Sequence, residues 1–450
     1  MTPARTGLQR LIASRWLPLA VVGLAFALRV GFVLAHQRPL FSDERDYDQL
    51  GWTLAQTGHY SSETGPTAYR SVGYPAFVAL IYSFAGRSPL AVKLVQAACD
   101  SATAFLLFLV LAPRGWRQST GDRGSRLAAV TAAALWALFP PAILFSNAML
   151  SECLAAFALV GLSYLVDRGF RFGAVVAGLL LGWVILMKPM MLLFAALLPV
   201  ALHKVRPARF VLTLLIVAFL PVGLWIGRNW AVMHASLLTT SGGINLLIGN
   251  NPSATGGYQK LDSIRRRAGG AEREEEADAA ARREAWNHIE SHPGRALLTG
   301  IRKLVVLATS EGELVVGAFA ANPGDQATRF REKYRSVPIW LHLMVSLPTA
   351  AILLLAAFGL ATRRPDILDR SFYALFFAVA ASCFVFFGGA RFRFPMIPFL
   401  MLFGSEFIAG GWRRLASTKE VRIALALAAA GVVAVVWAAE FAVIYGVTEL

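Results

Sequence analysis

Long apolar runs alternate with short polar segments along nearly the whole chain. Many of these runs reach about 20 residues, which is enough to cross a bilayer as a helix. The pattern predicts an all-α polytopic membrane protein with about 11 transmembrane helices. We expect these spans at 16–35, 90–112, 126–145, 150–166, 171–187, 189–202, 208–228, 338–360, 370–388, 394–411 and 422–446.

Two segments stand apart from this pattern. The stretch 73–85 is apolar but too short to span, so we expect an interfacial helix in the first outer loop. The region 229–337 is the one sizeable polar segment, and it divides the chain into an N-terminal transmembrane module (1–228), an outer loop (229–337) and C-terminal transmembrane helices (338–450). Within the loop, 271–290 predicts a solvated helix with i,i+4 ion pairs, and 295–309 predicts an amphipathic helix.

Composition supports a membrane location. The chain is 56% hydrophobic and 16% charged, whereas a soluble domain is about a quarter charged. The net charge of +16 could suggest nucleic acid, but the cations gather in alternate loops: 1–15, 113–125, 167–170, 203–207, 361–369 and 412–421. The positive-inside tendency places these loops in the cytoplasm, so we expect no nucleic acid partner. The first span then acts as a retained signal anchor, and the other loops face outward.

Adjacent carboxylates, Asp43 and Glu44, follow directly after the first span. A carboxylate beside the bilayer can act as general base for an acceptor hydroxyl, or the pair can cap the helix that begins near Asp46. Glu152 lies between the third and fourth spans on the same expected face. It is either a functional acid or a residue that stabilises a helix N-terminus. These carboxylates could hold a divalent cation, but nothing in their spacing requires one, and we expect no metal.

Several cations lie at the outer ends of spans, where the positive-inside tendency disfavours them. Each one alone could extend its side chain to the interface, but together they favour an anionic lipid ligand, because arginine and lysine match phosphate oxygens. These residues are Arg70, Lys188, Arg228, Arg391 and Arg393. Arg29 differs, since it lies well inside the first span and needs a buried partner, for which Asp100 is a candidate.

Other cofactor chemistry has little support. Cys99, Cys153 and Cys383 are dispersed in apolar segments, which is typical of small buried side chains. The histidines show no convincing metal-ligand spacing. No glycine-rich phosphate loop is evident, so a soluble nucleotide is not indicated.

The order of these motifs resembles the membrane glycosyltransferases of the GT-C type, in particular the bacterial dolichyl-phosphate-mannose–protein mannosyltransferase and aminoarabinose transferase group. Asp43, Glu44 and Tyr47 resemble its Asp-Glu-x-x-Tyr pattern. The segment 70–75 resembles its Arg-x-Pro-Gly-Tyr-Pro pattern, with Val72 as a departure. Further resemblance lies at 150–152, 187–189, 228–229, 249–252, 256–258 and 391–395.

The resemblance implies an inverting transferase that moves a mannose- or arabinose-like sugar from a polyprenyl-phosphate carrier to an acceptor lipid, glycan or protein. Asp43 would be the base, and Glu44 or Glu152 would orient the sugar or the base. Arg70, Lys188, Arg228, Arg391 and Arg393 would bind the lipid phosphate, and Tyr47, Tyr74, Asn250 and Asn251 would line the pocket. The location would be a bacterial cytoplasmic membrane, with the site facing outward.

Other functions stay open from the sequence. A flippase or transporter for a lipid-linked saccharide shares the many spans and the cations, but it predicts polar residues along a path and matching halves, which are not evident. An O-antigen ligase or polymerase gives no reason for adjacent acids directly after the first span. The sugar, the acceptor and the oligomeric state do not follow from the sequence.

Overall fold

The computed structural model describes residues 14–112, 123–259, 273–321, 323, 330–363 and 366–445. Most of the basic loops expected at 1–15 and 113–125 lie outside these ranges. The N-terminal part contains α2 (Leu17–Ala35), α3 (Asp43–Thr57), β1 (Ser61–Ser62), β2 (Gly65–Pro66), α4 (Gly73–Ala85), α5 (Pro89–Leu111), α6 (Arg123–Ala137), α7 (Pro140–Ser146), α8 (Glu152–Arg168), α9 (Gly173–Met187), α10 (Met191–Leu202) and α11 (Ala208–Met233). The strands β1 and β2 form a short antiparallel hairpin.

The outer loop and the C-terminal part are also helical. The loop contains α12 (Gly242–Gly249), α14 (Glu274–Ser291), α15 (Pro293–Leu307), α16 (Gly312–Phe319) and α17 (Phe330–Ser336). After it come α18 (Ile339–Thr362), α19 (Ile367–Val385), the 3₁₀ helix η1 (Ala390–Met396), α20 (Ile397–Ile408), the 3₁₀ helix η2 (Gly411–Ser417) and α21 (Glu420–Tyr445). The short helix expected at 73–85 is confirmed as α4.

The chain is a multi-pass helical membrane protein, but it has fewer full-length spans than expected. Within the described ranges, six helices are long and apolar enough to cross a membrane: α2, α5, α11, α18, α19 and α21. Two bent pairs raise the number to eight, because α6 and α7 meet at 51° and the segment 390–408 meets η2 at 73°. The remaining expected spans form α8, α9 and α10, with 17, 15 and 12 residues, which is below the usual spanning length.

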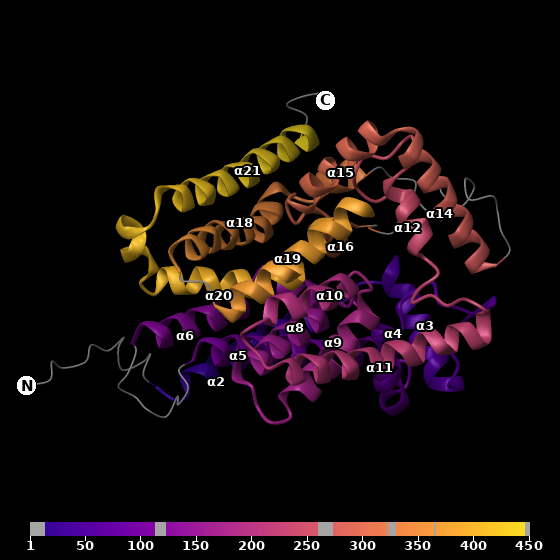
Figure 1. Ribbon diagram of the computed structural model, residues 1–450, viewed down its shortest axis with the longest axis horizontal. Helices are drawn as coiled ribbons and strands as arrows, with labels where there is room; N and C mark the ends of the chain where they lie inside the picture. Colours follow the sequence, from indigo (N-terminus) through magenta and orange to yellow (C-terminus); the bar gives the residue numbers. More distant parts are fainter. Residues whose placement is uncertain are drawn as a thin grey trace, which may run out of the picture.

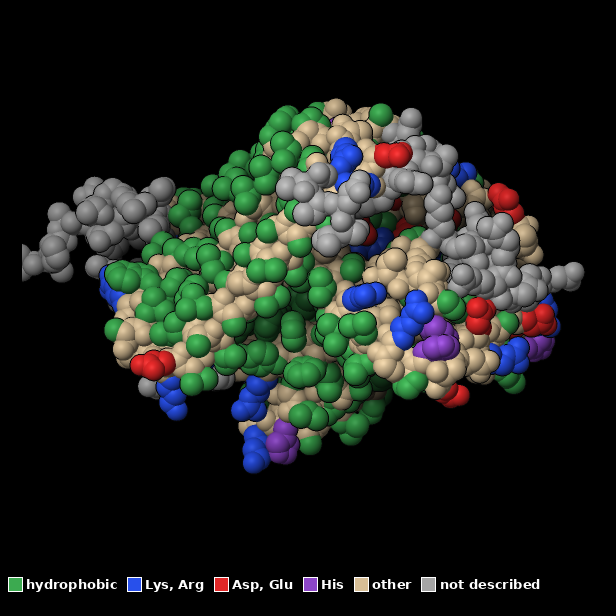
Figure 2. Space-filling model, turned by 90° about the horizontal axis from the view of Figure 1, so that it is seen from above, with side chains coloured by type: hydrophobic (Ala, Val, Ile, Leu, Met, Phe, Trp, Pro, Cys, Tyr) green, Lys and Arg blue, Asp and Glu red, His purple; other side chains and the backbone are tan. Residues whose placement is uncertain are grey.

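The helices form two layers, one over the other (Figure 1). The C-terminal helices α18, α20 and α21 lie over the N-terminal bundle, and α3, α4, α12 and α14 gather at the same end of the molecule. From above, hydrophobic side chains cover most of the middle of the molecule, charged and histidine side chains are most numerous toward that end, and further charged side chains lie at the opposite end and along the lower edge (Figure 2). This distribution suits a bundle immersed in lipid with polar regions at its ends.

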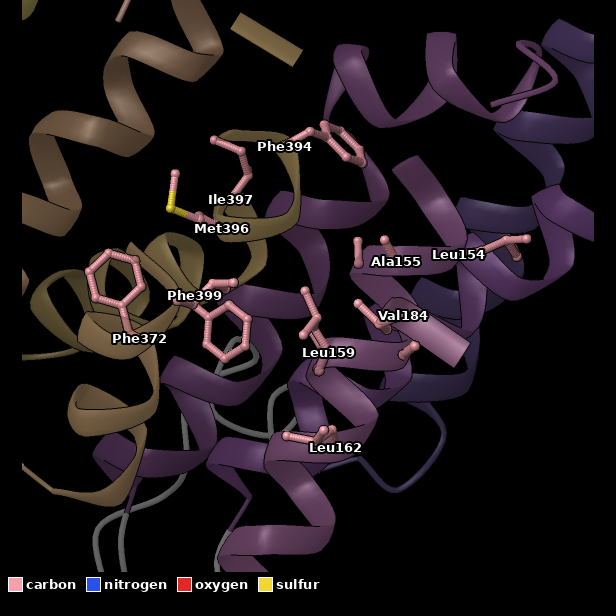
Figure 3. Close-up of a cluster of buried hydrophobic side chains, with 14 of the residues drawn as sticks. Leu154, Ala155, Leu159, Leu162, Val184, Phe372, Phe394, Met396, Ile397 and Phe399 are labelled. Atoms are coloured by element: carbon pink, nitrogen blue, oxygen red, sulfur yellow. The ribbon is translucent and has the colours of Figure 1, made fainter. Parts of the chain in front are cut away.

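The core is built around α8, which is buried along most of its length. In Figure 3, its Leu159 lies on the side of Phe399 of α20, with Phe372 of α19 beyond, whereas Leu154 points away from these rings. Phe394 and Met396 of η1 and Ile397 at the start of α20 belong to the same cluster. The short helix η1, which carries two of the candidate arginines, is therefore anchored in the core.

Backbone breaks inside the bundle have identifiable causes. Pro140 and Pro141 cannot donate backbone hydrogen bonds, so the chain bends between α6 and α7. Arg29 satisfies the carbonyls left free at this bend, since its guanidinium donates to Trp136 at 3.0 Å and Ala137 at 3.1 Å. The same guanidinium forms an ion pair with Asp100, which confirms the expected partner.

The charged helix of the outer loop is not simply solvated, in contrast to the prediction. One face of α14 is buried, with Asp278, Ala281 and Ala285 packed against α12. The Asp278 carboxylate accepts a hydrogen bond from the backbone of Gly243 and forms an i,i+4 ion pair with Arg282. The expected ion pairing therefore occurs, but it helps to fix α14 on the rest of the cap.

Candidate active site

The strongest candidate site begins where the first span turns into α3. Ser42 has a positive φ of 50°, which is uncommon for a residue other than glycine. This turn places Asp43 at the first position of α3, with Glu44 and Asp46 in the same helical turn. Acids at this position interact favourably with the N-terminus of the helix.

The Asp43 carboxylate is bound by two arginines, one on each oxygen. Arg70 Nη2 lies 2.7 Å from Oδ1, and Arg391 Nη1 lies 3.0 Å from Oδ2. Burial raises the pKa of Asp43, but the nearby Arg391 and Arg70 guanidiniums outweigh it and hold the pKa below its usual value. Asp43 is therefore ionised at neutral pH, and its negative charge is balanced before any ligand binds.

Arg70 and Arg391 differ in the number of contacts that hold them. Arg70 also binds Asp46, with distances of 2.9 Å from Nε and 2.7 Å from Nη2 to the same carboxylate oxygen. In addition, its guanidinium lies 5.9 Å from the ring centroid of Tyr47. Within the described part of the chain, Arg391 forms a single ion pair, to Asp43, and 34% of its side chain is exposed. Arg391 is thus the arginine that is freer to bind a ligand.

The two candidate tyrosines form one edge-on pair, but they differ in position. The ring centroids of Tyr47 and Tyr74 lie 4.9 Å apart. Tyr74 is fully buried, and its hydroxyl donates to Gln96 at 2.9 Å. Tyr47 is only partly buried and lies close enough to Asp43 and Glu152 for their charges to raise its pKa, after the larger effect of burial. Tyr47 therefore lies near Asp43, but neither tyrosine is among the residues that line the cavity beside Asp43, so their place in a substrate pocket stays a prediction.

A cavity of about 190 Å³ opens beside Asp43. Its lining includes apolar side chains of the membrane helices, with Phe32 of α2 and Leu144 of α7. It also includes charged side chains, which are Asp43, Glu44, Glu311, Glu313, Arg38 and Arg391. Such a wall suits a ligand with an apolar chain and a polar head.

Glu44 forms a structural brace within this wall. Its carboxylate is 2% exposed and binds Arg38 through both oxygens, at 2.6 and 2.9 Å. It also accepts the backbone N–H of Met149 at 2.9 Å and that of Phe41 at 3.3 Å. The carboxylate thereby connects the first outer loop to the turn before α8. From the described residues, each Glu44 oxygen accepts two hydrogen bonds, whereas each Asp43 oxygen accepts one, so Asp43 is the carboxylate with acceptor capacity left for a substrate hydroxyl.

Glu152 and Lys188, proposed separately from the sequence, form a buried pair with 2.9 Å between Nζ and Oε1. The pair lies near the site, since the charge of Glu152 acts on the pKa of both Arg391 and Tyr47. Lys188 is therefore already neutralised by Glu152 in this state.

Arg228 and Arg393 bind protein carbonyls. Arg228 donates to the carbonyls of Thr67, at 2.9 Å, and Tyr60, which fixes the hairpin loop. Arg393 is 4% exposed, donates to the carbonyl of Leu307 at 2.8 Å and binds Glu311 at 2.7 Å. Among the described residues, neither guanidinium pairs with Asp43, and phosphate binding by these two arginines stays a prediction.

The two asparagines lie away from the Asp43 cavity. Asn250 donates to the carbonyls of Leu246 and Val385, both at 2.8 Å, and its oxygen accepts from Lys303 at 3.0 Å. Asn251 caps its own turn through Leu247 and Ser253. Burial lowers the pKa of Lys303 to about 8. These residues join α12, α15 and the end of α19 and are not among those lining the cavity.

Glu313, on α16, is the main site residue that sequence reasoning missed. It lines the cavity, and Arg391 and Glu313 are close enough to affect each other's pKa. Partial loss of hydration beside the surrounding protein raises the pKa of Glu313, and Arg391 partly offsets this. The available signal was a pair of acids, Glu311 and Glu313, within the mostly apolar stretch 304–320.

A metal centre is not formed from the candidate acids. In the described part of the chain, no group of three or more His, Cys, Asp or Glu side chains is placed to hold a metal ion. Glu44 and Glu152 each face a cation instead of sharing a centre with Asp43.

Comparison with known proteins gives only remote likenesses. No protein-family model matches the chain, and no curated protein matches it. Among solved structures, the archaeal oligosaccharyltransferase AglB from Archaeoglobus fulgidus, in complex with an inhibitory peptide and a dolichol-phosphate, is 13% identical with a TM-score of 0.44. That match covers 95% of this chain and 56% of AglB, so the present chain spans little more than half of that protein.

A second likeness is to ArnT from Cupriavidus metallidurans bound to undecaprenyl phosphate. It is 13% identical with a TM-score of 0.38, and the match covers 90% of this chain and 78% of ArnT. Because both TM-scores are below 0.5, the function proposed below rests on the geometry of the site.

Proposed function

We propose that this protein is an inverting, polyprenyl-phosphate-sugar-dependent glycosyltransferase that transfers a sugar to an acceptor hydroxyl at the outer face of a bacterial cytoplasmic membrane. The observation that carries the proposal is the Asp43 carboxylate, which lies in the wall of a half-apolar cavity and is held by arginines. This combination provides a base, an anion-binding group and room for a lipid chain.

Asp43 is the base of the proposed reaction. Its carboxylate takes the proton of the acceptor hydroxyl while the acceptor oxygen forms a bond to the anomeric carbon of the sugar. The bond between that carbon and the phosphate oxygen breaks, and its electron pair leaves with the polyprenyl phosphate. Because attack and departure occur on opposite faces of the sugar, the configuration at the anomeric carbon inverts.

Arg391 is the residue that receives the departing phosphate. It lines the cavity, has one ion pair and is partly exposed. A guanidinium matches phosphate geometry and offsets the negative charge that develops on the leaving oxygen. Arg70 remains bound to Asp46 and keeps Asp43 in place. The apolar wall near Phe32 and Leu144 would receive the first part of the lipid chain.

The proposed orientation follows from the distribution of cations. Arg168 and Arg206 lie at the ends of helices opposite to Asp43, in loops that the positive-inside tendency assigns to the cytoplasm. Asp43, α12 and α14 then lie on the outer side, where a lipid-linked sugar is available after it has crossed the membrane.

The test is transfer of label from a panel of radiolabelled polyprenyl-phosphate sugars in membranes containing wild-type protein, Asp43→Asn or Glu63→Gln. We expect wild type to move label off the lipid with at least one sugar, and Asp43→Asn to lose about 100-fold or more of the rate. Glu63→Gln is the control, because Glu63 is an exposed acid between β1 and β2 and is not among the residues that line the cavity. It should retain most of the rate.

Two results would contradict the proposal. Equal rates in wild type and Asp43→Asn would remove Asp43 from the role of base. Lack of transfer with every donor, together with movement of lipid-linked sugar across vesicle membranes, would show a flippase instead.

A further inference from the structure

The charged wall of the cavity contains carboxylates that differ in their partners. Asp43 is bound by Arg70 and Arg391, Glu44 by Arg38, and Glu311 by Arg393 at 2.7 Å. Glu44 and Glu311 each already have an arginine partner and form part of the frame of the cavity. Asp43 also has arginine partners, but in the proposed reaction its Oδ2 is released when Arg391 binds the phosphate, and it then meets the acceptor hydroxyl.

Glu313 is different. Among the described residues, none is recorded in a hydrogen bond or ion pair with its carboxylate, although Arg391 and Glu311 are near enough to affect its pKa. The Glu313 side chain is exposed and belongs to the residues that line the cavity, so a ligand in the cavity can reach it. A carboxylate without a protein partner keeps its hydrogen-bond acceptors available. A ligand with hydrogen-bond donors can bind to them directly.

The position of Glu313 narrows the class of group that it can bind. Arg391 lies within electrostatic range of both Glu313 and Asp43, and all three line the cavity. A phosphate on Arg391 would be repelled by Glu313, so the phosphate itself is not the partner. A neutral group attached to that phosphate and carrying several O–H donors satisfies the carboxylate without repulsion.

We propose that Glu313 binds hydroxyl groups of the sugar carried by the lipid and thereby selects the glycosylated lipid over the bare polyprenyl phosphate. This inference rests on the proposed function and assigns a substrate-recognition residue to the same cavity. Two carboxylate oxygens accept from adjacent hydroxyls of the sugar, while Arg391 holds the phosphate and Asp43 faces the acceptor. Glu313 is a specificity-determining residue, and it has no part in the proton transfer.

The experiment measures binding in the absence of an acceptor, so that no turnover occurs. Full-length protein in lipid nanodiscs is titrated with undecaprenyl phosphate and with a panel of undecaprenyl-phosphate hexoses and pentoses. The variants are Glu313→Gln and Glu332→Gln, the latter an exposed acid of α17 that is not among those lining the cavity. The change Glu313→Gln deprives no other side chain of a partner, because none of the described residues forms a hydrogen bond or ion pair with this carboxylate.

We expect wild type to bind at least one glycosylated lipid more tightly than undecaprenyl phosphate. Glu313→Gln should weaken the binding of that glycosylated lipid by about tenfold, which corresponds to the loss of a hydrogen bond to a charged acceptor. It should leave the affinity for undecaprenyl phosphate unchanged or slightly higher, and Glu332→Gln should change neither.

Equal effects of Glu313→Gln on both lipids, or no effect on either, would overturn the assignment of Glu313 while leaving the proposed function intact. Absence of binding of every lipid to wild type would instead refute the proposed function, and the assignment of Glu313 with it.

Discussion

Asp43 and Arg391 are 348 positions apart in the sequence, yet Arg391 Nη1 donates to Asp43 Oδ2 across 3.0 Å. This contact joins the beginning of α3 to η1, and so connects the first outer loop to the C-terminal helices. In the proposed reaction, the same guanidinium binds the lipid phosphate. Asp43 and the phosphate therefore compete for Arg391, and this competition can be measured.

The first prediction concerns the affinity for the lipid phosphate. Asp43→Asn should bind polyprenyl phosphate several-fold more tightly than wild type, because it removes both the competing carboxylate and a repelling charge near the phosphate. Asp46→Asn should have a smaller effect, since Asp46 is bound to Arg70. Binding to protein in nanodiscs checks this, and weaker binding by Asp43→Asn would show that the carboxylate does not compete.

The second prediction concerns pH. A base works only when it is deprotonated, so the rate falls as pH decreases through its pKa. The pKa of Asp43 is held below its usual value, so kcat/KM, which reports the free enzyme, should stay flat down to about pH 4. Arg391→Gln removes a guanidinium that lowers this pKa, so its acid limb should move up by about one pH unit.

The comparison for this prediction is Arg393→Gln. Arg393 lies two positions from Arg391 and binds Glu311, not Asp43. It should therefore leave the position of the acid limb unchanged, whatever its effect on the amount of folded protein. An acid limb that stays at the same pH in Arg391→Gln would show that this arginine does not control the ionisation of Asp43.

Sequence patterns could predict the helices and the region of the site, but not which cations share it. Apolar runs and prolines mark where α2, α5, α11 and α18 lie, since both act locally along the chain. The sequence does not distinguish Arg391 from Arg393, because an arginine can donate either to a phosphate or to a carbonyl. Only the packing of η1 decides that Arg391 faces the cavity and that Arg393 faces the turn after α15.

The acids show the same limit. Asp43 and Glu44 are adjacent, so their spacing could not tell a base from a brace. The difference arises because Arg38 and the backbone of Met149 meet Glu44, and these partners come from other parts of the chain. Glu313 could have been noticed as an acid in an apolar stretch, but its open carboxylate is a property of the folded cavity alone.

The third prediction distinguishes Arg391 from Arg393 by the effects of their substitution on lipid binding and on stability. Arg391→Lys should keep the fold and weaken polyprenyl phosphate binding, because lysine cannot form a bidentate contact. Arg393→Lys should lower the free energy of unfolding by roughly 1–3 kcal/mol, since buried acceptors at Leu307 and Glu311 lose donors. Thermal unfolding and lipid binding, measured on the same preparations, check both. A phosphate-binding defect with normal stability in Arg393→Lys would contradict its structural role.

The last prediction concerns the close contact between α9 and α11, which positions the end of α9 beside Lys188. A Cβ added at Gly182 would lie 2.5 Å from the carbonyl oxygen of Ala218, and one at Gly178 would lie 2.6 Å from that of Leu214. Small residues four positions apart allow such close approach between membrane helices. Gly182→Ala should therefore push the helices apart and lower the free energy of unfolding by about 1–3 kcal/mol.

Gly31→Ala is the matched control, because a Cβ at Gly31 of α2 would meet nothing within 4 Å. Alanine favours helix more than glycine does, so this change should leave stability equal or raise it by up to about 1 kcal/mol. Denaturant unfolding in mixed micelles gives both values. The two substitutions add the same methyl group to a helix. An equal change in the free energy of unfolding would mean that the contact with α11 does not limit the position of α9. A loss of stability in Gly182→Ala together with a gain in Gly31→Ala would show that the destabilisation arises from the contact with Ala218.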